Sequence, residues 1–365
     1  MTYLKYIFFG LIGIWGYAQN EPPALNDLFN AQQQPDIACY RIPALATTGN
    51  GTLIAAIDER VPSCEDLKWN RDINIVMRRS EDNGKTWSAI KTVVDYPPGR
   101  SASDPSLILD HISGEIFMFF NYMDLDREKD VYYHRYIKSR DHGITWSEPV
   151  DITAQISKET WKKDFKFITS GRGMQTRSGK LVHTLVNLQA GLHLFASDDH
   201  GSNWYLIDHP IVPADESKVI ELTDGTWMVN SRINKGGHRV VHRTEDEGKT
   251  WVSESDDSLA DPGCNASIIN YPPNSKDANE KRLLFSNANH RSKRENMSVK
   301  ISYDEGKTWS EGKTIYAGSA AYSSMTVLSN GDIGLLFEKD ASRENVFVSF
   351  SLSWLTEGTS NGSSK

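Results

Sequence analysis

The sequence predicts an all-β fold, a single six-bladed β-propeller made of four-stranded antiparallel blades. The main observation behind it is an eight-residue box that occurs five times. Its central aspartates are Asp82, Asp141, Asp199, Asp246 and Asp304, which gives steps of 59, 58, 47 and 58 residues. Roughly 345 residues follow the first eighteen, so a unit of about 58 residues fits into them about six times. Alternating runs such as Ile73–Met77 precede the boxes, as expected for short strands.

The first eighteen residues are predicted to be a signal peptide. Lys5 precedes an apolar run from Ile7 to Trp15, and small residues follow at Gly16 and Ala18. The run is too short to cross a bilayer as a helix, although a buried N-terminal helix or a membrane anchor is the alternative. We therefore expect export to the periplasm or the medium, with no membrane insertion after cleavage. Residues 19–30 then form an N-terminal segment ahead of the propeller.

Each box has the pattern of a tight turn after a strand. In Ser80–Trp87 the aspartate can accept backbone N–H bonds, the glycine tolerates positive φ, and the tryptophan can cover the turn. A calcium loop would need several spaced oxygen ligands, whereas each box has one or two carboxylates. The boxes are therefore interpreted as structural, in one propeller domain over residues 31–355 with a polar tail at 356–365. Ile156–Phe165 is the only stretch with a mildly helical pattern.

Composition excludes several classes of function. Lys and Arg number 40 against 48 Asp and Glu, a formal charge of −8, so a general nucleic-acid binder is not expected. An anionic ligand must be held by a few local arginines. Cys39, Cys64 and Cys264 are an odd number and allow at most one disulfide, whose pairing the sequence leaves open. There is no metal-finger spacing, and neither a metal nor a cofactor is expected.

Tyr40-Arg41-Ile42-Pro43, followed by the five boxes, resembles the sialidase (exo-α-neuraminidase) superfamily over about residues 30–355. The resemblance implies an exported glycoside hydrolase that cleaves terminal α-linked sialic acid from glycoproteins, glycolipids and oligosaccharides. It also implies retention through a tyrosyl-enzyme intermediate, since sialidases use a tyrosine where most glycosidases use a second carboxylate. The implied partners are sialylated glycans, and we expect a monomer.

The resemblance also implies a set of substrate-binding arginines. Sialic acid carries a carboxylate, which planar guanidinium groups bind in bidentate fashion. Arg41, Arg232 and Arg294 match the family's three arginines, with Arg291 as the alternative for the third. Glu338 resembles the glutamate that supports the first of them, because a cluster of arginines needs a compensating charge.

The catalytic groups follow from the same resemblance. Tyr322 matches the family's nucleophile. A tyrosine suits this role because a neutral phenol is not repelled by the substrate carboxylate. Glu216 matches the base that takes its proton, with Glu221 as the alternative. Asp66 matches the acid/base for the leaving oxygen. The alternatives for that role are carboxylates that lie close by in the sequence: Glu65, Asp58 and Asp72.

Other functions remain open at this point. A trans-sialidase or an anhydro-forming sialidase would use the same chemistry with a different acceptor. A non-catalytic sialoglycan-binding propeller would keep the arginines and could lose Tyr322, Glu216 or Asp66, all of which are present here.

Overall fold

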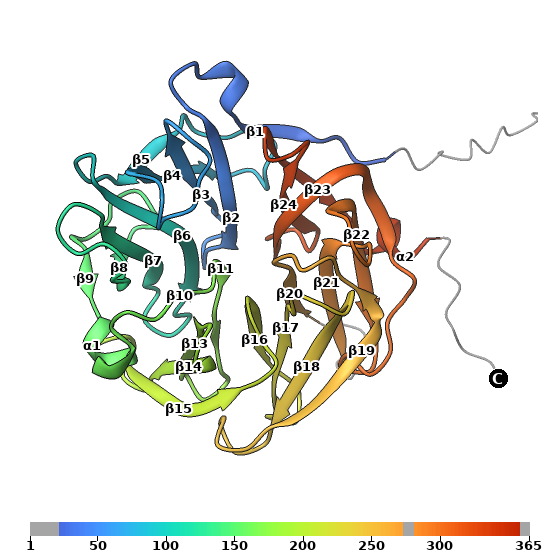
Figure 1. The fold of residues 1–365 in the computed structure, drawn as a ribbon. Helices are drawn as coiled ribbons and strands as arrows, with labels where there is room; N and C mark the ends of the chain where they lie inside the picture. Colours follow the sequence, from blue (N-terminus) through green and yellow to red (C-terminus); the bar gives the residue numbers. More distant parts are fainter. Residues whose placement is uncertain (1–21, 273–280, 358–365) are drawn as a thin grey trace, which may run out of the picture.

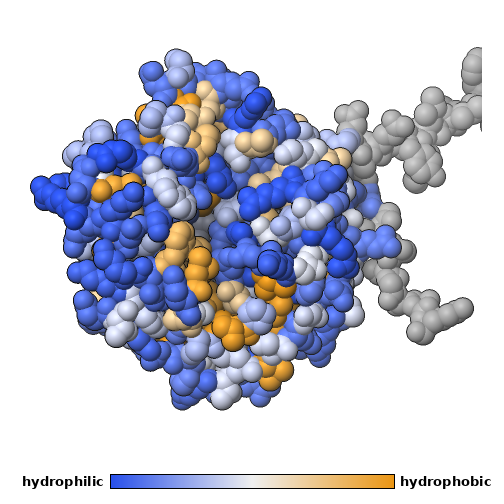
Figure 2. Space-filling model, in the orientation of Figure 1, coloured by the Kyte–Doolittle hydropathy of each residue, from blue (hydrophilic) through white to orange (hydrophobic). Residues whose placement is uncertain are grey.

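Antiparallel sheets arranged around a common centre make up nearly all of the described chain (Figure 1). The computed structural model describes residues 22–272 and 281–357; the predicted signal peptide and most of the predicted tail lie outside these residues. The fold is all-β and propeller-like, as the sequence predicts. Polar side chains cover most of the face shown in Figure 2, and hydrophobic ones gather near the middle of the ring.

Three of the sheets contain a run of four consecutive strands that leads outward from the centre; in the second of them a further short strand, described below, pairs on the inner side. The first is β2 (Cys39–Thr47), β3 (Leu53–Val61), β4 (Asp72–Ser80) and β5 (Lys91–Val94). The second is β6 (Arg100–Leu109), β7 (Ile116–Asp124), β8 (Tyr133–Ser139) and β9 (Val150–Asp151). A further sheet, made from the middle of the chain, is β16 (Ser217–Glu221), β17 (Trp227–Ser231), β18 (His238–Thr244) and β19 (Val252–Ala260).

Between these lies a sheet whose innermost position is interrupted. Its strands are β10 (Lys166–Ile168), β12 (Met174–Gln175), β13 (Leu181–Asn187), β14 (Gly191–Ser197) and β15 (Tyr205–Ile211). Between β10 and β12 the chain leaves this sheet, and β11 (Gly171–Arg172) pairs in parallel with β6 from the inner side. β11 thereby lies close to the centre of the ring, where Figure 1 shows it beside β2 and β6.

The longest strand, β23 (Lys313–Val327), belongs to two runs of four strands. The remaining strands of this sheet are β20 (Ser267–Tyr271), β21 (Arg282–Ala288), β22 (Glu295–Ser302), β24 (Ile333–Lys339), β25 (Glu344–Phe350) and β1 (Asn26–Asn30). The first part of β23 pairs with β22, and the second part pairs with β24 as an innermost strand. One continuous strand therefore joins what would otherwise be two separate sheets.

The first and last described strands meet in the same sheet. β1 pairs antiparallel with β25, from Asn26 opposite Phe347 to Asn30 opposite Glu344. β1 lies within the segment 19–30 that we expected to precede the propeller, so the sheets begin earlier than residue 31. The sequence pattern missed this because a single five-residue strand without its own box carries no repeat signal.

Helices in the described residues are short, and the sequence predicts only one helical stretch, at 156–165. α1 (Thr153–Ile156) and a 3₁₀ turn at Glu159–Trp161 occupy the stretch around the predicted helical segment 156–165, and α2 (Leu352–Thr356) follows β25. In the described part of the chain, no helix is long and apolar enough to cross a membrane.

All five boxes form the same hydrogen-bonded turn. In the first, Asp82 accepts the backbone N–H of Thr86 at 2.9 Å and its hydroxyl at 2.6 Å. Ser80 Oγ donates to Asp82 and accepts the N–H of Gly84 at 2.9 Å. These bonds, led by that from the Thr86 hydroxyl, lower the pKa of Asp82 to about 2. The other four boxes form equivalent bonds, with the Asn203 amide in place of the threonine hydroxyl in the third and Thr244 in place of the serine in the fourth.

The box glycine also lets neighbouring sheets approach each other. Gly84 has φ +83°, and a Cβ there would lie 2.2 Å from Cε1 of Phe347 on β25. A Cβ at Gly201 would lie 2.3 Å from Cζ of Phe117 on β7. These two boxes thus pack against the core of the adjacent sheet. Glycine is needed there both for the positive φ of the turn and because a side chain would clash with that core.

We expect Gly84→Ala to lower the free energy of unfolding by about 2–4 kcal/mol, since it combines an unfavourable φ with a steric clash. The matched control is Gly331→Ala, where φ is +87° but nothing lies within 4 Å of the new Cβ. This control should cost only about 1 kcal/mol. Urea unfolding of both variants measures the difference. Equal losses would mean that backbone strain alone, and not the contact with Phe347, makes glycine necessary.

Candidate active site

A cavity of about 250 Å³ opens near the centre of the ring, where the innermost strands begin. Its lining includes Arg41, Asp66, Asp104, Glu216, Arg232, Arg294 and Tyr322. Within each run of consecutive strands the neighbours are antiparallel, so the start of the first strand, the end of the second and the start of the third meet at one face. The boxes follow the third strands and therefore lie at the opposite face.

Three innermost strands carry the same irregularity at this cavity. In β2 the register passes from Arg41–Asp58 to Ala44–Ala56, in β6 from Ser103–Asn121 to Ser106–Phe119, and in β23 from Ala320–Lys339 to Ser323–Phe337. Each is a bulge with one extra residue, a device that redirects side chains.

Two of the bulges contain a residue before proline with positive φ. They are Ile42 at +68° and Asp104 at +65°, followed by Pro43 and Pro105. A β-branched residue rarely adopts this conformation, so Ile42 is a strained position at the cavity. Its N–H is held at 2.9 Å from Oε1 of Glu338, which stabilises the bulge that presents Arg41.

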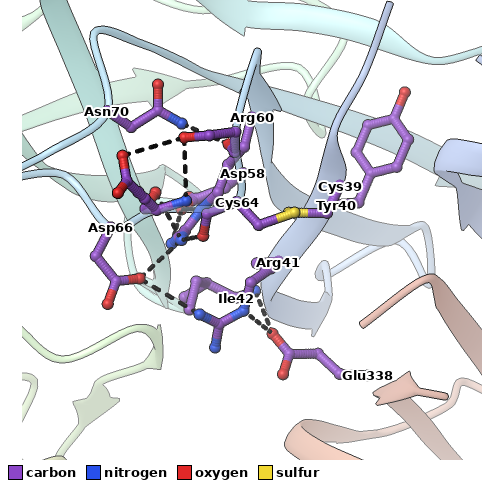
Figure 3. Close-up of a disulfide and its surroundings, with 12 residues drawn as sticks. Cys39, Tyr40, Arg41, Ile42, Asp58, Arg60, Cys64, Asp66, Asn70 and Glu338 are labelled. Atoms are coloured by element: carbon purple, nitrogen blue, oxygen red, sulfur yellow. Dashed lines mark hydrogen bonds and ion pairs between the residues drawn. A yellow bond between two sulfur atoms is a disulfide. The ribbon is translucent and has the colours of Figure 1, made fainter. Parts of the chain in front are cut away.

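Glu338 holds the first arginine. Its side chain is fully buried, and Oε1 accepts a bond from Nε of Arg41 at 3.3 Å (Figure 3). Its Oε2 accepts the N–H of Tyr322 at 3.3 Å. This carboxylate bridges β24 to β2 and β23. Burial disfavours the charged form of Arg41 and lowers its pKa. Glu338 and other nearby acids outweigh this effect and raise the pKa of the guanidinium.

The hydroxyl of Tyr322 lies at the centre of a second cluster. It donates to Oε2 of Glu216 at 2.8 Å and accepts from Nη1 of Arg232 at 3.1 Å. Arg232 also pairs with Glu216 directly. The backbone explains the arrangement: Ser217 and Ser231 are opposite each other in β16 and β17, and Arg232 donates its N–H to the carbonyl of Glu216 at 3.0 Å. Burial and then the charge of Glu216 raise the pKa of Tyr322 well above its usual value.

Arg294 completes a ring of cations around Tyr322. The guanidinium carbons of Arg41 and Arg294 lie 5.4 and 5.5 Å from the centre of the tyrosine ring. Arg294 donates to the carbonyl of Gly263 at 3.0 Å, and among the described residues no carboxylate forms an ion pair with it. The alternative, Arg291, is exposed and contacts Asp257 outside the cavity.

Asp66 faces the same cavity from the loop after β3. Its Oδ1 accepts bonds from Nη1 of Arg60 at 2.7 Å and from Nη1 of Arg41 at 3.3 Å, and 58% of its side chain is exposed. Partial burial favours a higher pKa, but Arg60 and Arg41 outweigh it and lower the pKa of Asp66. In the free protein this carboxyl is therefore ionised at neutral pH.

The loop that carries Asp66 is fixed at several points. A disulfide joins Cys39, two residues before Arg41, to Cys64, two residues before Asp66 (Figure 3). Arg60 donates to the carbonyls of Cys64 and Glu65 at 2.9 and 3.0 Å. The sequence left the pairing open; Cys264 is the free, buried cysteine.

The sequence pattern missed two residues, Asp104, which lines the cavity, and Arg60, which pairs with Asp66 beside it. Arg60 is buried and pairs with the buried Asp58 at 2.9 Å, and Asp58 also accepts the N–H of Asp104 at 2.9 Å. Burial and the neighbouring Asp58 raise the pKa of Asp104 to about 8. A signal was available, since Asp104-Pro105 repeats the Ile42-Pro43 pattern one unit later in the sequence.

The remaining sequence alternatives lie elsewhere or are occupied. Glu221 is at the far end of β16, where it pairs with Arg177. Asp58 is enclosed by Arg60 and Ser103, and Asp72 accepts from Asn74. The structure thus gathers Arg41, Asp66, Glu216, Arg232, Arg294, Tyr322 and Glu338 around one cavity. Among the residues described, no group of acidic, histidine or cysteine side chains is arranged to hold a metal.

Part of the cavity wall is apolar. It is formed by Leu67, Tyr132, Phe165, Phe167 and Leu188. The cavity therefore combines a charged side, suited to a carboxylate, with a nonpolar side.

We expect the stability of the protein to depend on pH through Asp104. Its folded pKa of about 8 lies above the usual carboxyl value, so the folded state binds a proton that the unfolded chain releases. This contribution is present at low pH and is lost as the pH rises towards 8. Between pH 6 and 8 the wild type should lose about 2 kcal/mol relative to Asp104→Asn, which does not titrate. Urea unfolding at both values is the measurement, and parallel pH profiles would contradict the assignment.

Comparison with known proteins gives a consistent result. Residues 65–335 match the family model described as a BNR repeat-like domain. The chain is 34% identical to a sialidase of Micromonospora viridifaciens, over 87% of this chain and 52% of that protein. It is 30% identical to a sialidase of Bacteroides fragilis (strain YCH46), over 82% of this chain and 60% of that protein. The chain thus spans between half and two thirds of the length of these two relatives.

Solved structures agree on the fold. The Hadza microbial sialidase Hz136 superposes with a TM-score of 0.81 at 30% identity, covering 91% of this chain and 69% of that one. A leech intramolecular trans-sialidase gives a TM-score of 0.77 at 20% identity, covering 91% and 71%. The second likeness concerns the fold alone.

Proposed function

This chain belongs to the sialidase family, and we propose that it is an exo-α-sialidase that hydrolyses terminal α-linked sialic acid from glycoconjugates. The observation that carries the proposal is the arrangement of Arg41, Arg232 and Arg294 around the hydroxyl and ring of one buried tyrosine, which is itself bonded to Glu216. Three cations suit an anionic sugar, and a tyrosine paired with a carboxylate suits nucleophilic attack.

The charge balance of the cavity supports an anionic substrate. Arg41 is partly neutralised by Glu338 and Asp66, and Arg232 by Glu216. Within the described residues Arg294 donates to a carbonyl and pairs with no carboxylate, so its guanidinium is available to a substrate carboxylate in bidentate geometry. The apolar wall of the cavity suits the nonpolar parts of a large acylated sugar.

In the first step, Tyr322 Oη attacks the anomeric carbon and transfers its proton to Glu216. The raised pKa of Tyr322 makes a spontaneous phenolate rare, so the 2.8 Å bond to Glu216 is needed to take the proton as the new C–O bond forms. At the same time the bond to the leaving oxygen breaks, and Asp66 gives that oxygen a proton.

Asp66 must gain a proton before it can act as an acid. In the free cavity Arg60 and Arg41 keep its pKa low. A bound carboxylate would compete with Asp66 for Arg41 and would add a negative charge nearby, and both effects raise the pKa of Asp66. Substrate binding thereby converts this residue from an ion-paired carboxylate to an acid.

In the second step, Asp66 takes a proton from water, and the resulting hydroxide attacks the anomeric carbon. Tyr322 leaves and recovers its proton from Glu216. Two displacements at the same carbon give overall retention, and water as acceptor makes the enzyme a hydrolase. A transferase or an anhydro-forming enzyme would instead yield a sialylated acceptor or an internal ether, which product analysis distinguishes.

Two structural expectations accompany the proposal. We infer six blades, because β23 gives its first part to one run of four strands and its second part to another. We also infer export to the periplasm or the medium. The Cys39–Cys64 disulfide favours an oxidising compartment, consistent with a signal peptide at residues 1–18.

We expect Tyr322→Phe to reduce turnover of a fluorogenic sialoside by at least about 10³-fold, because the nucleophilic oxygen is lost while the ring remains. The melting temperature should change by only about a few degrees. Trapping the wild type with a fluorinated sialic acid should label the peptide that contains Tyr322. A label on a carboxylate, or inversion at the anomeric carbon seen by proton NMR, would overturn the mechanism.

Asp66→Ala should affect substrates according to their leaving group. For sialyllactose, kcat/KM should fall by about 10²–10⁴-fold, because the lactose oxygen needs a proton. For an activated aryl sialoside the loss should be far smaller. Steady-state kinetics on both substrates measure the contrast. A similar loss on both would indicate that Asp66 only holds the loop in place.

A further inference from the structure

The loop that carries Asp66 also presents an exposed tryptophan. Trp69 is 53% exposed, one of the more exposed large hydrophobic side chains of the described residues. Its N–H and that of Asn70 both donate to the carbonyl of Asp66, at 2.8 and 3.1 Å. The segment is therefore a single helical turn, in which residues three apart lie on the same side. Trp69 accordingly flanks the carboxyl of Asp66.

Contacts place Trp69 at the rim of the cavity. Its neighbour Lys68 lines the cavity, and Lys68 Nζ lies 5.9 Å from the ring centres of both Trp69 and Phe165. Phe165 in turn packs on Tyr132 at 5.1 Å, and both belong to the apolar wall. Lys68 is held by Asp130 at 3.1 Å. Lys68 thus lies between the indole and the apolar wall, and the indole stands just outside the cavity lining.

The platform is also rigid. The Cys39–Cys64 disulfide and the two bonds from Arg60 fix the start of the loop, and Asn70 Nδ2 donates to the carbonyl of Ser63 at 2.7 Å at its end. An exposed tryptophan on a fixed turn loses little entropy when a ligand stacks on it. None of these bonds involves the indole of Trp69, so the anchoring of the loop does not explain a tryptophan at this position.

We propose that Trp69 forms a leaving-group subsite, stacking on the sugar that is attached to the terminal sialic acid. The inference rests on the proposed function, because it takes Asp66 as the group that protonates the glycosidic oxygen. That oxygen belongs to the leaving sugar, so the first residue of the leaving group must lie beside Asp66. A flat, rigid aromatic surface binds the nonpolar face of a neutral hexose. Trp69 then selects for oligosaccharide substrates over small glycosides.

The test compares a substrate with a leaving sugar to one without. We expect Trp69→Ala to lower kcat/KM for sialyllactose about tenfold, mainly through KM. For α-sialyl fluoride, which has no leaving sugar, kcat/KM should stay within about twofold of the wild type. Trp69→Phe, which keeps an aromatic surface, should recover most of the loss. Tyr303→Ala is the matched control, an exposed aromatic residue in the last box at the opposite face, and should change neither value.

The outcomes separate the two hypotheses. An equal loss on both substrates would show that Trp69 supports the loop and would overturn the subsite, as would unchanged kinetics on both. If the wild type released sialic acid from neither substrate, the proposed function would be wrong, and the subsite with it. A direct readout is available in the Tyr322→Phe background, where Trp69→Ala should weaken binding of intact sialyllactose but not of free sialic acid.

Discussion

One buried carboxylate determines how the site is built. Glu338 accepts hydrogen bonds from the N–H of Ile42, from Nε of Arg41 and from the N–H of Tyr322. It thereby fixes the strained bulge of β2, the orientation of an arginine and the backbone of the proposed nucleophile together. A fully buried charge is tolerated only when it is paired and hydrogen-bonded, so these contacts require one another. The position of the cavity follows from this mutual requirement.

The rest of the cavity extends the same balance of charge. Cations and carboxylates alternate from Glu338 through Arg41, Asp66 and Arg60 to Asp58. Asp104 lies beyond the last of these and keeps its proton, since burial and the charge of Asp58 disfavour a further negative charge there. Bulges in three innermost strands lie beside Arg41, at Asp104 and at Tyr322. The same backbone device therefore serves both sides of the site.

Much of the fold and of the site could be predicted from the sequence, because repeated boxes and rare residue combinations mark the strands and the candidate residues. The five boxes indicate the sheets, and the resemblance around Arg41 indicates which arginines and which tyrosine to consider. Contacts between distant segments could not be predicted. The shared strand β23 and the pairing of β1 with β25 depend on three-dimensional proximity, which no local pattern encodes. Asp104 could be predicted only in part. Like Ile42 it precedes a proline, but no recognisable motif surrounds it.

The pairing of the first described strand with the last has a consequence for biosynthesis. Arg41 comes from the early part of the chain, whereas Tyr322 and Glu338 are made much later, and β25 is needed to receive β1. During translation, a nascent chain that lacks its last sheet has neither a closed ring nor Glu338 as a partner for Arg41. The proposed site therefore becomes complete only late, when the last sheet has formed. Products of synthesis or proteolysis that lack this sheet lack Glu338 and Tyr322, and with them part of the site.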